Sequence, residues 1–307
     1  LRPNAKLGSS RPFSVPHFHA ETLKKEVQRL CDIGVLRRNP TVRYSLPSFI
    51  IPKKDRSVRF ISDFRKLNKE LERAPFPTPK IKDLLQSLAG FKWASAIDLN
   101  MGYYHIELDP FAQELCTIVF PWGKYSYNRL PMGIACAPDI FQNEMATLME
   151  ELEFVRVYLD DLLVISKGSL EDHLEKLDMV LAKLTKAGLK VNLRKSFFAQ
   201  TEVEYLGYLV TREGIKPQHK KIEAILALQP PSTLKGLRSL LGMVQYYRDM
   251  WPRRSHILAP LTNACSIKNK KKFQWTPEMG KAFEQMKKLI AQETILALPD
   301  YSKPFQI

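Results

Sequence analysis

The chain has 307 residues, of which 45% are hydrophobic and 26% are charged, so we expect a folded protein with more than one core. Lysine and arginine outnumber aspartate and glutamate by 47 to 32, and this net charge of +15 favours a polyanionic partner such as nucleic acid. No apolar run approaches the ~18 residues that a membrane-spanning helix needs, so no membrane role is expected.

The first half of the chain predicts a mixture of helices and strands. Leu23, Val27 and Leu30 recur at helical spacing within residues 20–34, and Gly34 is a plausible stop. Residues 48–64 predict a hairpin of two strands with a basic tip. Residues 74–85 read as a proline-rich connector that leads into a short helix, and residues 93–100 as a short strand.

The pattern becomes helical after Gly214. One helix is predicted over residues 232–250, with Leu234, Leu237, Leu241 and Val244 on its buried face. A second is predicted from the cap Thr276, with a buried stripe made of Phe283, Met286 and Ile290. We therefore expect an α+β body to about residue 215 and a basic, all-helical region to about residue 292.

Two adjacent acids interrupt an apolar run at residues 154–166. Asp160 and Asp161 predict a hairpin turn that lifts both carboxylates out of a sheet, although a purely structural turn remains an alternative. Asp98 ends a similar apolar strand. If the two strands are neighbours, the carboxylates converge and need a proton or a cation, and hard oxygen ligands favour Mg²⁺, with Mn²⁺ as a substitute. A basic protein with such a site fits phosphoryl transfer on nucleic acid.

The ordered set of motifs resembles a reverse transcriptase, specifically the gypsy class (Metaviridae) of LTR retrotransposons, which are related to retroviral enzymes. The motifs are VRFISDFRKLN (58–68), IDLNMGYYHIEL (97–108), NRLPMGIACAPDIFQNEM (128–145), VRVYLDDLLVIS (155–166), EYLGYLV (204–210) and the two helical regions from 237 to 290.

The resemblance implies an α+β right-hand polymerase with fingers, a palm built on an antiparallel sheet, and a helical thumb. The fingers are expected at 1–72 and 106–136, the palm at 73–105 and 137–215, and the thumb at 216–292. Residues 293–307 are expected to begin an RNase H domain whose catalytic residues this sequence does not contain, so we expect no RNase H activity.

The resemblance also implies roles for the acids. Asp98 and Asp160 match the principal metal ligands, Asp161 matches a third carboxylate, and the backbone carbonyl of Leu99 completes one ion's shell. Lys195 matches a basic residue near the pyrophosphate that could act as a general acid, and a plain surface lysine is the equal alternative.

The incoming nucleotide is expected to meet residues from three motifs. Lys53 and Arg59 match residues that grip the triphosphate, and Tyr103 matches an aromatic gate against the ribose 2′-hydroxyl. The remaining nucleotide-binding candidates are Met101, Gly102, Met132 and Gly133. Met132 departs from the glutamine or phenylalanine of related enzymes, which leaves selectivity open.

The template and primer are expected to contact a longer set of residues. Asp63 and Arg65 form either a template contact or a salt bridge within the fingers, and these alternatives stay open. Residues 204–210 match the primer grip. The remaining template or primer candidates are Pro138, Phe141, Gln142, Tyr158, Leu206, Gly207, Tyr208, Lys235 and Arg238.

The implied partners are an RNA template, a DNA or tRNA primer, an RNA–DNA hybrid and dNTPs. Homodimerisation, or contact with the RNase H and integrase parts of a polyprotein, is left open. The expected location is cytoplasmic virus-like particles, with later nuclear entry.

The main alternative function is a catalytically silent nucleic-acid-binding scaffold from a domesticated element. An RNA-directed RNA polymerase is disfavoured by Tyr103, and a retron, group II intron or telomerase type is disfavoured by the thumb pattern.

Overall fold

The computed structural model describes residues 1–52, 58–251, 253–266, 273–292 and 296. The chain divides into two compact units. The first unit comprises Leu1–Pro79, Ile97–Val164 and Glu175–Ser196, and the second comprises Lys80–Ala96, Ile165–Leu174 and Phe197–Ile307. The boundaries of the predicted fingers, palm and thumb stay predictions.

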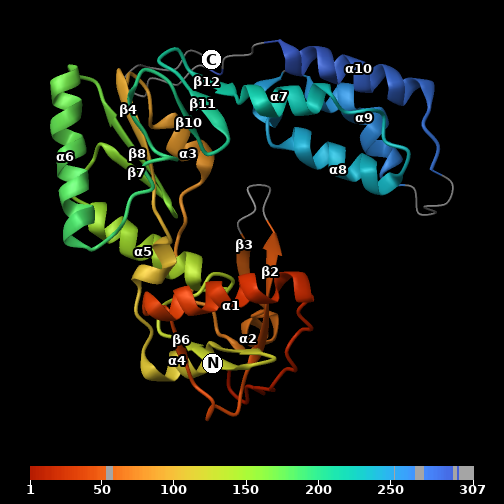
Figure 1. The fold of residues 1–307 in the computed structure, drawn as a ribbon. Helices are drawn as coiled ribbons and strands as arrows, with labels where there is room; N and C mark the ends of the chain where they lie inside the picture. The colour runs from red at the N-terminus through yellow and green to blue at the C-terminus, as the bar shows by residue number, and fades with distance from the viewer. Residues whose placement is uncertain (53–57, 252, 267–272, 293–295, 297–307) are drawn as a thin grey trace. The chain divides into compact units, whose positions relative to one another are not determined.

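The first unit contains a five-stranded sheet, of which Figure 1 labels β2, β3 and β6. Its order is β1-β6-β5-β2-β3, with β2 and β5 parallel and the other pairs antiparallel. The strands are β1 (Leu36–Arg38), β2 (Leu46–Pro52), β3 (Val58–Ser62), β5 (Thr117–Phe120) and β6 (Gly123–Tyr127). The helices of this region are α1 (His17–Asp32), α2 (Arg65–Glu70) and α4 (Pro110–Leu115).

The core of this region is built from α1 and the sheet. Leu23, Val27 and Leu30 of α1 are at most 2% exposed and belong to one buried cluster with Phe120 and Tyr127 of the sheet. The chain leaves α1 through Gly34, whose φ of +73° lies in the left-handed region that glycine tolerates best. Both predictions for this helix are confirmed.

A four-stranded sheet has the order β7-β8-β4-β9. Its strands are β7 (Val155–Tyr158), β8 (Asp161–Ser166), β4 (Trp93–Asp98) and β9 (Phe197–Gln200). The helices adjoining these strands in sequence are α5 (Ala137–Met149), α6 (Leu170–Lys186) and the short 3₁₀ helix η1 (Gly102–His105). Pro138 stands in the first turn of α5, as expected for a helix start.

The rest of the second unit combines a three-stranded sheet with helices. The sheet is the meander β10 (Val203–Tyr205), β11 (Tyr208–Val210) and β12 (Ile215–Pro217). The helices are α3 (Ile81–Gln86), α7 (His219–Leu226), α8 (Leu234–Gln245), η2 (Arg248–Met250), α9 (Arg254–Ala264) and α10 (Pro277–Ala291). No helix among the described residues is long and apolar enough to cross a membrane.

The predicted helices after Gly214 are confirmed, with one correction. Thr233 caps α8 and Thr276 caps α10 by accepting backbone N–H groups, and Phe283, Met286 and Ile290 are buried. In α8 the inward residue is Leu240, which is 2% exposed, instead of the predicted Leu241. Both leucines fit a helical stripe, and packing selects between them. Residues 293–307 lie outside the described residues, apart from Leu296, which bridges Ile215.

Candidate active site

The two adjacent acids stand at a tight hairpin turn, as predicted. Tyr158 pairs with Asp161, so the turn itself consists of Leu159 and Asp160. Leu159 has a φ of +52°, a strained value for a leucine. Its N–H donates to Oε1 of Gln142 at 2.7 Å, and Nε2 of Gln142 donates to the carbonyl of Val157 at 3.3 Å. One buried amide from α5 therefore holds the turn from both sides.

Asp98 and Asp160 meet where β4 ends. The N–H of Leu99 donates to the carbonyl of Asp160 at 3.2 Å. The Asp98 N–H donates to the Ser196 hydroxyl at 3.1 Å, and the Asp98 carbonyl accepts the N–H of Asn192 at 2.8 Å. These bonds occupy the backbone of Asp98, which fixes the point from which its carboxylate projects.

The site concentrates negative charge in partly buried surroundings. Burial, and then the charges of Asp161 and Asp98, raise the pKa of Asp160 to about 6. Burial and Asp98 also raise the pKa of Asp161. Nζ of Lys195 lies 3.7 Å from Oδ1 of Asp98 and offsets part of this charge. The structure thus brings together the three predicted acids and Lys195.

The donor set fits a hard cation. Oδ1 of Asp160 is buried and has no hydrogen-bond partner among the described residues, so a cation is a natural partner for it. Carboxylate oxygens suit Mg²⁺ or Mn²⁺. In the described part of the chain, no group of three or more His, Cys, Asp or Glu side chains is arranged to hold one ion. The metal site therefore stays a prediction that rests on Asp98, Leu99, Asp160 and Asp161.

Gly102 and Tyr103 border the acid pair. A Cβ on Gly102 would lie 2.7 Å from Oδ1 of Asp160 and 2.7 Å from Cζ of Phe141, so only glycine fits there without displacing them. The Tyr103 ring lies 5.1 Å from that of Phe141, centroid to centroid, at a tilt of 39°. Burial raises the pKa of Tyr103 to about 12. Met101, directly before them, has a φ of +55°.

The other nucleotide-binding candidates are less enclosed. Met132 is 51% exposed, and Gly133 beside it has a φ of +97°. Arg59 is exposed on β3, paired opposite Ile51, which confirms the predicted hairpin. Lys53 lies outside the described residues. Among the described residues, Arg59 forms no ion pair with the acids, and its grip on a triphosphate stays a prediction.

The structure gives two of the template candidates a supporting role. Phe141 and Gln142 are each 1% exposed, and their side chains lie against Gly102 and the hairpin turn, while contact of this segment with a template stays a prediction. The spacing alone could not distinguish the inner face of α5 from the outer one. Asp63 and Arg65 form a bidentate ion pair at 2.6 and 2.8 Å, which lowers the pKa of Asp63. Of the two alternatives for this pair, the structure contains the salt bridge.

The remaining candidates lie on exposed or half-exposed positions. Pro138 and Tyr158 are half-buried at the start of α5 and the end of β7. Leu206 and Gly207 form the turn between β10 and β11, with Tyr208 opening β11. Lys235 is exposed on α8. Arg238 donates to the carbonyl of Cys265 at 3.0 Å, so it links α8 to the end of α9.

Sequence reasoning missed two kinds of supporting residue. Ser196 holds the backbone of Asp98, and a lone serine gives no signal of that role. Tyr246 and Tyr247 contact the turn at Leu206 and Gly207. The two adjacent tyrosines within the helix predicted over residues 232–250 were a visible signal, but the prediction considered only the aliphatic residues of that segment.

The described geometry agrees with comparisons to known proteins. The family model described as reverse transcriptase (RNA-dependent DNA polymerase) matches residues 51–210, which include the acids and the hairpin turn that carries Leu206 and Gly207. The chain belongs to the reverse transcriptase family.

Relatives of this chain include retrotransposon polyproteins. It is 33% identical to the retrovirus-related Pol polyprotein of transposon 297 from Drosophila melanogaster, over 96% of this chain and 28% of the relative. It is 30% identical to the Tf2-3 transposon polyprotein of Schizosaccharomyces pombe, over 95% of this chain and 22% of the relative. The chain therefore spans less than a third of these curated relatives.

Solved structures similar to this chain include a viral enzyme. The foamy viral protease–reverse transcriptase in complex with an RNA/DNA hybrid matches with a TM-score of 0.86 at 26% identity, covering 94% of this chain and 39% of that one. The same viral protein in complex with double-stranded DNA matches with a TM-score of 0.91 at 25% identity, covering 98% of this chain and 63% of that one. The α+β fold of reverse transcriptases is thereby confirmed for this chain.

Proposed function

We propose that this chain extends a DNA or tRNA primer with dNTPs on an RNA or DNA template, as the polymerase part of a retrotransposon Pol polyprotein. The observation that carries the proposal is the convergence of Asp98 and Asp160 at a rigid hairpin turn. Support comes from family membership and from the nucleic acids named for the similar viral enzyme. We attribute the polymerase reaction alone to these residues, with cytoplasmic virus-like particles as the proposed location.

The chain's own residues orient the reactants. Gln142 and Ser196 fix the backbones that carry Asp160 and Asp98, so the carboxylates keep their places as substrates come and go. Two Mg²⁺ ions held by Asp98, Asp160, Asp161 and the Leu99 carbonyl would stabilise charge on the attacking and leaving oxygens. The Tyr103 ring is suited to exclude a ribose 2′-hydroxyl. Lys195 would supply positive charge, and as a general acid a proton, and this role is supported by the 3.7 Å between its Nζ and Oδ1 of Asp98.

Primer extension tests the proposal. The chain is given a labelled primer annealed to an RNA template, dNTPs and Mg²⁺, beside Asp98→Asn, which removes one negative charge at nearly constant volume. We expect full-length product from the parent, little from the variant, and similar hybrid binding by both. Tight binding without extension by the parent would favour the silent scaffold, and equal extension by both would remove the site from catalysis.

A further inference from the structure

The turn between β10 and β11 is bonded to two successive tyrosines at the end of α8. The Tyr246 hydroxyl donates to the carbonyl of Leu206 in a short hydrogen bond, and the Tyr247 hydroxyl donates to the carbonyl of Gly207 at 2.9 Å. The Tyr208 hydroxyl returns the contact by donating to the Tyr246 carbonyl at 3.0 Å. All these residues belong to the second unit.

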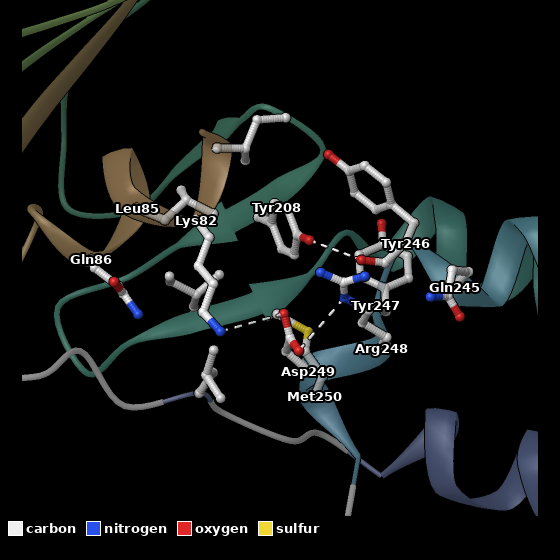
Figure 2. A pocket seen from close by; sticks show the side chains of 13 residues that line it. Lys82, Leu85, Gln86, Tyr208, Gln245, Tyr246, Tyr247, Arg248, Asp249 and Met250 are labelled. Atoms are coloured by element: carbon white, nitrogen blue, oxygen red, sulfur yellow. Dashed lines mark hydrogen bonds and ion pairs between the residues drawn. The ribbon is translucent and has the colours of Figure 1, made fainter. Parts of the chain in front are cut away.

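The rings of Tyr208, Tyr246 and Tyr247 also pack against one another. Tyr208 stacks on Tyr246 with centroids 5.2 Å apart, and Tyr247 meets each of them edge-on at 5.5 and 5.2 Å. Figure 2 shows the three side chains together at the wall of a cavity of about 290 Å³, with the dashed bond from Tyr208 to Tyr246. Such aromatic pairs stabilise a fixed geometry beyond the area they bury.

The turn is shaped to receive the tyrosines. Gly207 has a φ of +78°, and a Cβ there would lie 2.7 Å from the Tyr246 hydroxyl oxygen. Leu206 also has a positive φ, of +45°, which is uncommon outside glycine. A strained turn persists when its surroundings fix it, and here two side-chain donors do so.

The hydroxyls set the direction of two peptide planes. A trans peptide is planar, so its N–H points away from its C=O. When the Leu206 carbonyl faces Tyr246, the N–H of Gly207 faces the opposite way, and the same holds for the plane between Gly207 and Tyr208. Burial raises the pKa of Tyr208 and of Tyr247 to about 12, so these two hydroxyls remain protonated donors at neutral pH.

We infer that Tyr246 and Tyr247 are positioning residues for the primer strand: their hydroxyls orient the Leu206–Gly207 turn, and the turn's backbone in turn orients a primer phosphate. This inference rests on the proposed polymerase function and on the expectation that residues 204–210 hold the primer. The ligand class is the phosphodiester backbone of the primer near its 3′ end, which backbone N–H groups can bind without reading its sequence.

Tyr246→Phe, Tyr247→Phe and the double variant test the inference, since each keeps the ring and removes only the hydroxyl. Tyr44→Phe is the matched control, because the Tyr44 hydroxyl is buried and has no hydrogen-bond partner among the described residues. For each protein one measures the melting temperature, the Kd for an RNA–DNA hybrid, and the single-turnover rate and apparent Kd for the next dNTP.

If the tyrosines position the primer, their removal should lower the single-turnover rate without changing the affinity for dNTP. The double variant should lose about tenfold in the single-turnover rate, equivalent to ~1.4 kcal/mol in the barrier, with its dNTP affinity unchanged. The melting temperature of Tyr44→Phe should stay close to that of the parent, and that of the double variant should fall only by the few degrees that two lost hydrogen bonds at a partly exposed turn cost. An unchanged rate in the double variant, or a rate that falls only in step with melting temperature, would overturn the inference. Failure of the parent itself to extend a primer would instead refute the proposed function beneath it.

Discussion

The buried side chain of Gln142 forms hydrogen bonds to both sides of the turn that carries Asp160. Its amide bonds Leu159 on one side and Val157 on the other, and it is 1% exposed. A turn whose central leucine has a positive φ needs support beyond local backbone preference. Gln142 was predicted as a template or primer contact, which stays a prediction, and its buried amide supports the turn that carries the acids.

Gln142→Leu should therefore damage both stability and rate. The leucine leaves the Leu159 N–H without its acceptor, and leaving a buried polar group unpaired costs about 1–3 kcal/mol. Urea unfolding measures the loss of stability, and primer extension measures the rate. Gln200→Leu is the control, since the Gln200 side-chain amide donates to the nearby carbonyl of Phe198 at an exposed site. Equal stability of the two variants would contradict the supporting role of Gln142.

Tyr103 is the residue with the clearest expected effect on sugar selection. Replacing it with Val removes the ring that packs on Phe141, and the pocket should then admit a ribose 2′-hydroxyl. A steric difference of this size is worth about 1–3 kcal/mol, so relative use of rNTPs should rise roughly 10- to 200-fold. Tyr103→Phe keeps the ring and should keep the parental preference. Single-nucleotide incorporation with matched rNTP and dNTP checks this, and an unchanged ratio in the valine variant would remove Tyr103 from the gate.

At the scale of elements, α5 is tied to the segment after α2 by a buried acid. Asp139 accepts from Arg73 at 2.6 and 3.0 Å and from the Phe76 N–H at 3.2 Å, although Asp139 itself is only 3% exposed. These donors lower the pKa of Asp139, with the hydrogen bond from Arg73 as the largest cause. The ion pair anchors the start of the helix that also carries Phe141 and Gln142.

The sign of the pH dependence follows from that lowered pKa. A carboxyl with a depressed folded pKa contributes stability above its unfolded pKa of about 3.9, and the contribution is lost as pH falls through the folded value. Asp139→Asn should therefore be less stable than the parent at pH 7, and the gap should close as the pH falls below about 4. Urea midpoints across this range provide the measurement. Glu151→Gln, at an exposed pair with Lys183, should show almost no gap at any pH. A gap for Asp139→Asn that stays constant with pH would contradict the assignment.

Sequence patterns predicted where helices and strands form better than they predicted which side of a helix is buried. The hairpins at residues 48–64 and 154–166 and the capped helices after Gly214 were predictable, because period-two alternation, turn residues and caps act locally. The inward choice of Leu240 over Leu241, and the burial of Phe141 and Gln142, depend on what packs against each helix. Contacts such as Ser196 with Asp98 join residues about a hundred positions apart, and no local rule signals them.

For the molecule as a whole, the net charge of +15 is the property that most favours binding of a nucleic acid, which is a polyanion. Several candidate contacts are exposed cations, among them Arg59 and Lys235. Cations on a surface bind phosphates without regard to sequence and release counterions as they do so. In the proposed function, the charge would provide affinity for template and primer, and the acid pair would carry out the reaction on them.

Hybrid binding should accordingly weaken steeply with salt. If 6–10 phosphates are contacted, affinity should fall roughly 10³- to 10⁵-fold between 50 and 200 mM salt. Lys235→Gln should reduce the slope of log Kd against log salt by about one if Lys235 contacts a phosphate. Fluorescence anisotropy with hybrids of two unrelated sequences checks both points. A flat salt response, or a strong preference for one sequence, would contradict phosphate-driven binding.

The proposed function requires the carboxylates of Asp98 and Asp160 for DNA synthesis, and this requirement can be measured in a single step of incorporation. Single-turnover incorporation of one dNTP on a preformed RNA–DNA hybrid with Mg²⁺ is compared between the parent and Asp160→Asn, with hybrid binding recorded for the same samples. We expect a large loss of rate in the variant at an unchanged Kd for the hybrid. Incorporation at the parental rate by Asp160→Asn would contradict this requirement.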